Sequence, residues 1–273
     1  MFPKITHQKR RETLKKYDLQ STIYALDFDG VLCDSVIETA ITAWRLAQNI
    51  WQDMPKIEAS QKSIDDFREI RPFLETGYEA ILIMRLLYLG VSIDRLCDNY
   101  KIEIQKLIDQ EGLDIEVLKK LFGEARDRWI ANSLEEWVAM NPLFDGVVEF
   151  LNSLERENLH IVTTKQERFV KYILEANGIE LEDDKIWGLD KGMTKADILF
   201  DIQSNNPNKK ILFVEDRYPA LVTVIEDNRL DGVMLQLASW GYNTPLDKQK
   251  AMQSERIELI VSFKKVDKSC KIK

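Results

Sequence analysis

Three apolar runs of the chain each end in two closely spaced polar residues. The three sets are Asp27 and Asp29, Thr163 and Thr164, and Glu215 and Asp216. Several carboxylates in one place repel each other unless a cation offsets their charge, and hard oxygen ligands favour Mg²⁺. If the fold brings the three run ends together, these residue types therefore indicate metal-assisted chemistry on a phosphate-bearing substrate.

A lysine in the same part of the chain supplies a positive charge for such a substrate. Lys195 follows Gly192-Met193-Thr194 at the predicted start of a helix, where the ammonium group and the helix N-terminus would both attract a phosphoryl group. The Thr163 hydroxyl and the backbone N–H of Thr164 could donate hydrogen bonds to the same oxygens. Lys191 is an alternative phosphate lysine, and Lys195 is preferred because it lies at a helix start.

Alternating strands and helices would position these residues. A strand is predicted over 23–28, and after Pro142 the pattern alternates, with strands at 159–163, 210–214 and 232–237 and helices at 147–157, 166–177, 195–204 and 219–228. Strands separated by helices predict a parallel sheet with right-handed crossovers and helices on both faces, a Rossmann-like α/β fold. In such a sheet, ligands bind at the carboxyl ends of the strands.

Residues 36–141 have helical periodicity and interrupt this alternation. Ser35 and Glu38 match a capping box that opens the first helix, and further helices are predicted over 75–89, from Ser92 to Gln110, and over 115–140. An insert of this length is compatible with a compact sheet only if it forms its own subdomain. The predicted organisation is a basic arm over 1–20, an α/β core of 21–35 and 142–273, and an all-α insert of 36–141.

The composition excludes several classes of protein. The net charge of −8 argues against nucleic acid as a partner, and no apolar run approaches the ~18 residues that a membrane span needs. The three cysteines are an odd number without CxxC spacing, which suits a reduced, cytoplasmic protein and offers no zinc site. With only two histidines, chemistry built on several of them is excluded. The sequence leaves the oligomeric state open.

The order of these motifs resembles that of the haloacid dehalogenase-like hydrolase superfamily. The resemblance rests on Asp27-Phe28-Asp29-Gly30-Val31, Thr163, Lys195 and Glu215-Asp216, and it covers residues 22–35 and 142–242. The helical insert after the first motif resembles the cap of the phosphoglycolate phosphatase and β-phosphoglucomutase-like subgroup. Trp240-Gly241-Tyr242-Asn243 is also similar to the phosphoglycolate phosphatase-like members.

The resemblance implies a role for each matching residue. Asp27 would be the nucleophile that forms an aspartyl-phosphate, and Asp29 the general acid that later activates water. Mg²⁺ would be held by the Asp27 carboxylate, the backbone carbonyl of Asp29, and Asp216. Thr163 and Lys195 would bind the phosphoryl oxygens. Because dehalogenating members lack the second aspartate, Asp29 indicates phosphoryl chemistry.

The fourth motif departs from the family pattern. Glu215 replaces the usual glycine, and Ala220 stands where a further acid is common. Glu215 could coordinate the metal ion itself, or it could contact the residues that coordinate the metal ion. Arg217 could pair with Glu215 or contact the substrate, and both interpretations remain open.

These inferences predict a Mg²⁺-dependent phosphatase for a small phosphorylated metabolite. The insert would act as a cap that closes over Asp27 and excludes water. Arg71 is the candidate substrate residue of the cap, because it precedes Pro72 in a predicted non-helical joint. The alternatives are a phosphomutase with the same nucleophile and a non-catalytic binding protein that retains the fold.

Overall fold

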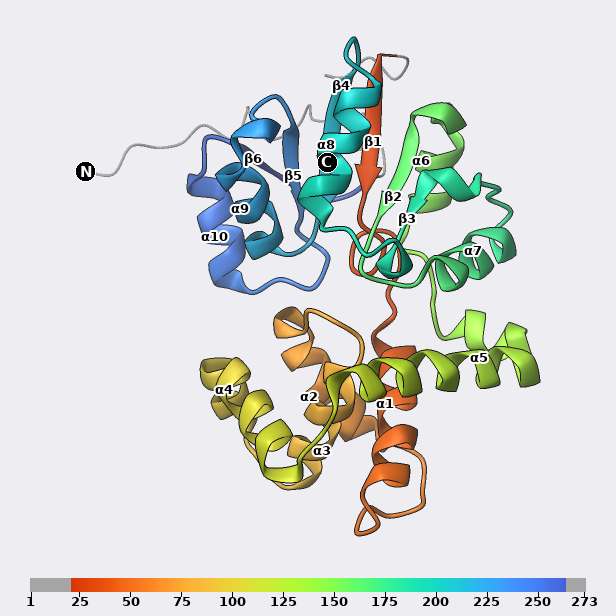
Figure 1. Ribbon diagram of the computed structural model, residues 1–273, viewed down its shortest axis with the longest axis vertical. Helices are drawn as coiled ribbons and strands as arrows, with labels where there is room; N and C mark the ends of the chain where they lie inside the picture. Colours follow the sequence, from red (N-terminus) through yellow and green to blue (C-terminus); the bar gives the residue numbers. More distant parts are fainter. Residues whose placement is uncertain (1–20, 264–273) are drawn as a thin grey trace, which may run out of the picture.

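A six-stranded parallel sheet forms the centre of the α/β part of the protein (Figure 1). The structure is a computed structural model, and it describes residues 21–263, so the basic arm expected over 1–20 lies outside the described residues. The strands run in the order β3-β2-β1-β4-β5-β6. Their bounds are β1 (Thr22–Leu26), β2 (Leu159–Val162), β3 (Ile186–Trp187), β4 (Lys210–Glu215), β5 (Met234–Ala238) and β6 (Ile257–Ile260).

Helices cover both faces of the sheet, because successive side chains of a buried strand point to opposite sides. On β1, Tyr24 and Leu26 pack with the apolar side chains of α6 and α7, whereas Ile23 and Ala25 pack with those of α8 and α9. This arrangement confirms the predicted Rossmann-like fold. The helix bounds are α6 (Val147–Asn152), α7 (Glu167–Ala176), α8 (Lys195–Asn205), α9 (Tyr218–Glu226) and α10 (Pro245–Gln253).

The insert between β1 and β2 is helical and lies beyond the carboxyl ends of the strands (Figure 1). Its helices bury an apolar cluster of their own, with Trp44, Phe67 and Leu82 among its members. Trp137, near the end of the insert, packs instead in the cluster beneath the sheet. The insert contains α1 (Val36–Ile50), α2 (Gln61–Ile70), the 3₁₀ turn η3 (Arg71–Phe73), α3 (Glu79–Tyr88), α4 (Ile93–Glu111) and α5 (Ile115–Ala139).

Several predicted element ends differ from the structure. The capping box at Ser35 is wrong, because the Ser35 side chain makes no cap hydrogen bond and the Glu38 carboxylate turns to Arg126. The helix predicted over 75–89 begins at Glu79, and that over 147–157 ends at Asn152 before a 3₁₀ turn, η4 (Arg156–Asn158). The Ser92 cap is confirmed, since its side chain accepts the N–H of Arg95.

Strands β3 and β6 and helices α2 and α10 are not among the predicted elements. Strand β3 has only two residues, too few to show alternation, and it is preceded by η5 (Asp183–Lys185). The remaining 3₁₀ turns are η6 (Leu189–Lys191) and η7 (Asn228–Leu230). Within residues 21–263, no helix combines the length and the apolar character that crossing a membrane requires.

Candidate active site

A cavity of about 160 Å³ lies where the carboxyl ends of the strands meet the helical insert. All the residues predicted to form the site line this cavity: Asp27, Asp29, Arg71, Thr163, Thr164, Lys195, Glu215 and Asp216. Lys191 does not line it; it lies exposed in η6. The fold thus brings together residues from five separate segments and, of the two candidate lysines, places only Lys195 at the cavity.

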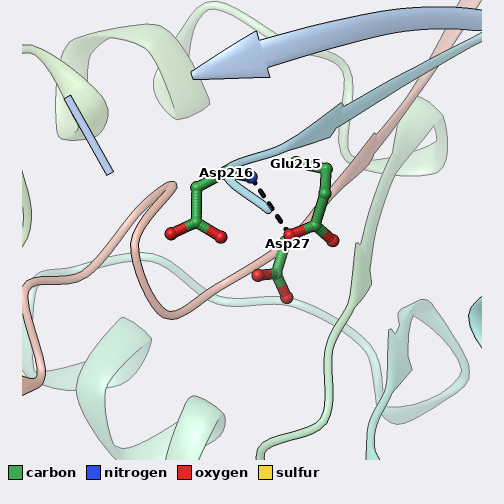
Figure 2. A group of neighbouring side chains, drawn as sticks. All are labelled: Asp27, Glu215 and Asp216. Atoms are coloured by element: carbon green, nitrogen blue, oxygen red, sulfur yellow. Dashed lines mark hydrogen bonds between the residues drawn. The ribbon is translucent and has the colours of Figure 1, made fainter. Parts of the chain in front are cut away.

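Three carboxylates meet at the ends of β1 and β4 (Figure 2). The backbone N–H of Asp27 donates to the carbonyl of Val214 at 2.9 Å, which continues the pairing of the two strands by one residue. Oxygen atoms of Asp27, Glu215 and Asp216 consequently lie within 4.8 Å of one another, and all three side chains are buried.

Lys195 is the cation closest to these acids. Its Nζ lies 2.9 Å from Asp27 Oδ1 and 2.6 Å from Glu215 Oε2. Burial alone would lower the pKa of Lys195, but the charges of Asp27 and Glu215 outweigh burial and raise the pKa above its ordinary value. Lys195 is the first residue of α8, whose N-cap Thr194 accepts the N–H of Asp197, so the helix start holds the ammonium group at the strand ends.

Glu215 uses both of its carboxylate oxygens in hydrogen bonds. Oε2 accepts from Lys195, and Oε1 accepts the backbone N–H groups of Asp216 and Arg217 at 3.1 and 3.0 Å. The side-chain ion pair between Arg217 and Glu215 is not formed, because Arg217 Nη2 points instead to Glu75 of the insert, 3.6 Å away. Glu215 therefore shapes the turn after β4 and fixes Lys195.

The Asp216 carboxylate is closely surrounded by backbone atoms, and one of its two oxygens accepts no hydrogen bond among the described residues. Its Oδ2 accepts the backbone N–H of Tyr242 at 2.5 Å, while Oδ1 is buried without a hydrogen-bond partner among residues 21–263. A Cβ at Gly30, where φ is +88°, would lie 1.9 Å from Asp216 Oδ2, and one at Gly241 would lie 2.4 Å from Asp216 Cβ. Glycine is thus required on both sides of this carboxylate.

The electrostatics of this group fit a divalent cation. Burial and the charge of Glu215 raise the pKa of Asp27 to about 6, although Lys195 opposes the rise. Burial and the charges of Glu215 and Asp27 raise the pKa of Asp216 well above its ordinary range. Carboxylates outnumber the lysine, and the buried Asp216 Oδ1 has no partner among the described residues. All the candidate ligand atoms are hard oxygens, so the residues present match the preferences of Mg²⁺.

A family model of haloacid dehalogenase-like hydrolases matches residues 22–238. The chain belongs to this family. None of the curated protein sequences matches it.

Solved structures share the fold of this haloacid dehalogenase-like hydrolase at low sequence identity. A predicted phosphoglycolate phosphatase from Haemophilus somnus has a TM-score of 0.54 at 18% identity, covering 84% of this chain and 90% of its own. A predicted phosphatase from Clostridium acetobutylicum has a TM-score of 0.50 at 17% identity, covering 87% and 93%. A haloacid dehalogenase-like family hydrolase from Streptococcus pneumoniae also has 0.50 at 17%, covering 87% and 92%.

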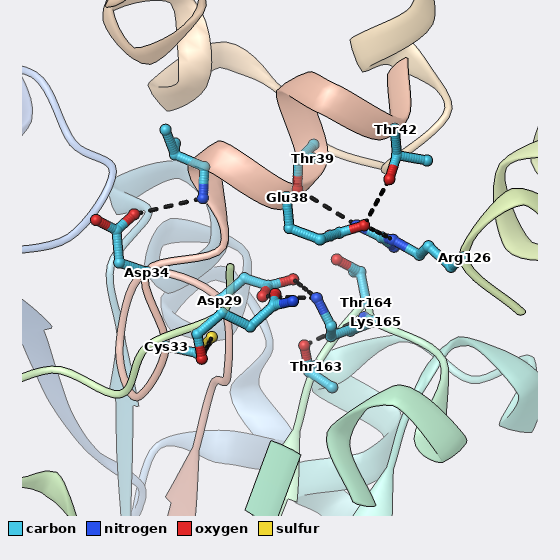
Figure 3. Close-up of polar contacts among 12 residues, drawn as sticks. Asp29, Cys33, Asp34, Glu38, Thr39, Thr42, Arg126, Thr163, Thr164 and Lys165 are labelled. Carbon is cyan, nitrogen blue, oxygen red and sulfur yellow. Dashed lines mark hydrogen bonds and ion pairs between the residues drawn. The ribbon is translucent and has the colours of Figure 1, made fainter. Parts of the chain in front are cut away.

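In the hydrolase, Asp29 pairs with a lysine that sequence reasoning missed. Lys165 Nζ lies 3.1 Å from Asp29 Oδ1, and the Lys165 side chain is fully buried (Figure 3). Burial raises the pKa of Asp29, but the charges of Lys165, Arg71 and Arg126 outweigh burial and lower it below its ordinary value. The available signal was position, since Lys165 follows Thr163 and Thr164 directly at the end of β2.

The two threonines have different environments in the hydrolase. Thr163 is buried, and its Oγ1 accepts the backbone N–H of Lys165 at 3.2 Å. Thr164 is exposed, and its hydroxyl donates to the backbone carbonyl of Glu75 in the insert at 3.4 Å. Thr163 therefore belongs to the inner part of the cavity, and Thr164 to its boundary with the insert.

Arg71 and Tyr242 join the insert to the α/β part of the hydrolase. The Arg71 guanidinium carbon lies 4.2 Å from the centroid of the Tyr242 ring, and the Arg71 residue is only 6% exposed. The Tyr242 hydroxyl donates to Asp34 at 2.8 Å, which fixes the ring. The sequence motif around Tyr242 predicted no such role, because the contact joins residues far apart in the chain.

A separate buried ion pair lies near the site within the insert. Arg126 donates to Glu38 at 2.8 and 2.7 Å, and the Thr42 hydroxyl donates to the same carboxylate at 2.8 Å (Figure 3). The Arg126 guanidinium also stacks on Phe122 at 4.3 Å. This pair connects α1 with α5 and does not line the cavity.

Proposed function

We propose that this hydrolase is a Mg²⁺-dependent phosphatase that acts on a small phosphorylated metabolite through an aspartyl-phosphate. The observation that carries the proposal is the cavity in which Asp27 and Lys195, 2.9 Å apart, are surrounded by Thr163, Asp29 and Asp216. A nucleophile, a phosphate-binding cation and a candidate acid thus share one small volume. The descriptions of the Haemophilus and Clostridium structures as predicted phosphatases support the same reaction class.

Asp27 would attack the phosphorus atom of the substrate. A bond forms between an Asp27 oxygen and phosphorus while the bond from phosphorus to the substrate oxygen breaks. Lys195, the Thr163 hydroxyl and the backbone N–H of Thr164 would hold the phosphoryl oxygens in place. Water then attacks phosphorus, the bond to Asp27 breaks, and inorganic phosphate leaves.

Asp29 would carry the proton in both steps. It gives a proton to the departing substrate oxygen and then takes one from the attacking water, so that it returns to its starting form. Lys165 favours the ionised form of Asp29, which is the form needed in the second step. The negative charge of a bound phosphoryl group favours protonation of Asp29 before the first step.

The metal site would consist of Asp27, Asp216 and the backbone carbonyl of Asp29. When bound there, Mg²⁺ neutralises negative charge on the transferring phosphoryl group. Because both oxygens of Glu215 already accept hydrogen bonds, we propose that Glu215 serves this site by holding Lys195 beside Asp27.

The helical insert would be the cap of the enzyme. Residues 36–141 contribute Arg71, Leu74 and Glu75 to the cavity, next to the reacting groups on the strand ends. Such a cover excludes water from the aspartyl-phosphate and selects the organic part of the substrate. This cap belongs to the class inserted after the first motif, in keeping with the phosphoglycolate phosphatase-like subgroup.

A phosphate-release screen tests the proposal. The purified chain is incubated with a panel of small phosphoesters, once with Mg²⁺ and once with EDTA, and inorganic phosphate is measured. Phosphate release that depends on Mg²⁺ is the expected result. Conversion of a sugar 1-phosphate to its isomer without phosphate release would indicate a phosphomutase. No turnover on any phosphoester and no Mg²⁺ binding would indicate a binding protein.

The composition and the thiols suggest where the enzyme works. Cys33 is a buried free thiol and Cys97 is also unpaired, which suits a reducing compartment, and we propose the cytoplasm. The net charge of −8 disfavours nucleic acid as the substrate.

A further inference from the structure

Arg71 is a buried arginine without an acidic partner. The insert contains three arginines that are each 6% exposed: Arg71, Arg85 and Arg126. Arg85 pairs with Asp53 at 2.8 Å and Arg126 with Glu38 at 2.7 Å. Within residues 21–263, Arg71 makes no ion pair, and its Nε is buried without a hydrogen-bond partner. A buried guanidinium group without a direct ion pair is costly, and the charges of Asp29 and Asp216 act on Arg71 only from a distance, so its donors remain available for an anion that enters the cavity.

The Arg71 side chain is held at the cavity that contains Asp27. It lines that cavity together with Leu74 and Glu75 of the insert. The Tyr242 ring packs on the guanidinium group at 4.2 Å, and the Asp34 carboxylate accepts the Tyr242 hydroxyl. A contact with an aromatic face orients a guanidinium group but leaves its N–H donors available.

Two more polar groups near Arg71 lack hydrogen bonds. Arg217 also lines the cavity, and its Nε is buried without a partner among the described residues. The Tyr100 hydroxyl is buried and unpartnered as well, and its ring stacks on Phe73 at 6.0 Å. The charges of Arg71 and Arg217 act on this hydroxyl, as do those of the acids Glu79 and Glu75, which places it in the same neighbourhood. Donors thus accumulate around one region, on the side of the cavity formed with the insert.

We propose that Arg71 binds a second anionic group, a carboxylate or a second phosphate, on the organic part of the substrate. The inference rests on the proposed function, because it assumes that the first phosphoryl group occupies the end of the cavity formed by Asp27 and Lys195. The cavity of about 160 Å³ is small compared with common ligand pockets of ~300–1,000 Å³. The substrate class is therefore a short phosphorylated metabolite with a second anionic group.

Matched substrates test this inference with the wild-type enzyme. D-3-Phosphoglycerate and glycerol 3-phosphate are of similar size, but the first has a carboxylate where the second has a hydroxymethyl group. Propane-1,3-diol bisphosphate and the corresponding monophosphate form a second pair, in which the additional anion is a phosphate. We expect kcat/KM to be about 10- to 100-fold higher for one of the compounds with two anionic groups than for its partner, in the range of a charge-assisted hydrogen bond. The preferred pair identifies the anion.

Substitution of Arg71 assigns the preference to this residue. In Arg71→Gln, the preference should fall to within about 3-fold, because KM rises for the compound with two anionic groups and its kcat/KM falls more than that of the partner with the phosphate alone. Arg71→Lys should recover part of the preference, because it restores the charge without the planar donor set. Arg128→Gln is the matched control, since Arg128 lies on the insert helix α5 with its side chain 59% exposed.

Binding provides a second measurement that does not depend on turnover. In the background of Asp27→Asn, isothermal titration should show weaker binding of the preferred compound with two anionic groups when Arg71→Gln is added, by a factor similar to that in KM. Circular dichroism melting curves verify that each variant is folded.

Three results would overturn the inference. Equal kcat/KM for both members of each pair in the wild-type enzyme would show that no second anion is recognised. If Arg71→Gln lowered kcat/KM by the same factor for both members of a pair, the role of Arg71 would be to offset the negative charges of Asp216 and Asp29. Unchanged binding and KM in Arg71→Gln would remove Arg71 from the substrate site. By contrast, absence of phosphate release from every compound in the broad screen would reject the proposed phosphatase function itself.

Discussion

Two groups of buried charged side chains lie close together in this protein, and they differ in whether acidic and basic side chains are present in equal number. In the insert, Glu38 and Arg126 form a matched pair, in which the carboxylate also accepts the Thr42 hydroxyl. At the strand ends, three carboxylates share one lysine, and Asp216 Oδ1 has no partner among residues 21–263. Both groups are removed from water, so the difference lies in the charges that the chain itself supplies.

The comparison separates a structural role from a functional one. A buried pair whose hydrogen bonds are satisfied needs nothing further, and its removal affects stability. A buried group with surplus negative charge is unfavourable by itself, and a ligand or metal ion can supply the missing positive charge. The pKa values of Lys195, Asp27 and Asp216 are all raised above their ordinary values, as expected where acids outnumber cations. We expect substitutions to alter activity in the second group and folding in the first.

The largest effect is expected for Asp27→Asn. Removal of the proposed nucleophile should lower kcat by at least about 10³-fold, measured as phosphate release with saturating Mg²⁺. The free energy of unfolding should change by less than about 1 kcal/mol, because the ionised form of Asp27 is unfavourable in its buried position and Lys195 retains Glu215 as a partner. Activity within 10-fold of wild type would contradict the nucleophile assignment.

The second largest effect is expected for Glu38→Gln. This change leaves the Arg126 guanidinium buried without a compensating charge, which should lower the free energy of unfolding by about 3 kcal/mol in urea denaturation. Glu58→Gln is the control, because Glu58 pairs with Arg45 on the surface with its side chain 70% exposed, and the expected change is below about 0.5 kcal/mol. An equal loss of unfolding free energy in the two variants would show that the buried pair stabilises the fold no more than the surface pair.

A smaller effect on activity is expected for Glu215→Gln. The variant keeps the shape of the side chain but removes one charge that fixes Lys195, so kcat/KM should fall about 10- to 30-fold. The midpoint of a Mg²⁺ titration should stay within 3-fold of wild type if Glu215 acts through Lys195. A midpoint raised more than 10-fold would instead make Glu215 a direct metal ligand.

The smallest effect concerns His160, a buried base that makes no ion pair with an acid within residues 21–263. Burial lowers the pKa of His160 from 6.5 to about 4, and its Nδ1 accepts the Trp187 indole N–H at 3.1 Å. Between pH 6.5 and pH 4 the unfolded chain binds more protons than the folded one, so the stabilising contribution is complete above pH 6.5 and is lost as the pH falls. From pH 7.5 to pH 5 this contribution should decrease by roughly 1 to 2 kcal/mol.

The His160→Gln variant isolates that contribution. Glutamine retains a hydrogen-bond acceptor for Trp187 but does not titrate, so the free energy of unfolding should depend less on pH by the same amount. Urea denaturation of both proteins at pH 7.5 and pH 5 measures the difference. Parallel pH profiles would show that His160 is protonated in the folded state.

Local sequence patterns determined the fold class and the residues that meet at the cavity. Each of the three principal strands is an apolar run that stops at polar residues, and parallel pairing places those ends at one edge of the sheet. Asp27, Thr163 and Asp216 could therefore be assigned to one site from the sequence, and the helix start at Lys195 separated it from Lys191. The short β3 has too few residues for such a pattern, and it was missed for that reason.

Contacts between distant residues were decided only by the tertiary structure. Ser35 and Glu38 match a local capping pattern, yet Glu38 pairs with Arg126, 88 residues away, because a buried guanidinium group outcompetes a cap. Lys165 reaches Asp29 across 136 residues, and Arg71 packs on Tyr242. A residue's own neighbours in sequence determine where a strand or helix ends, whereas the partner of a buried charge depends on which segments the folded chain brings into contact.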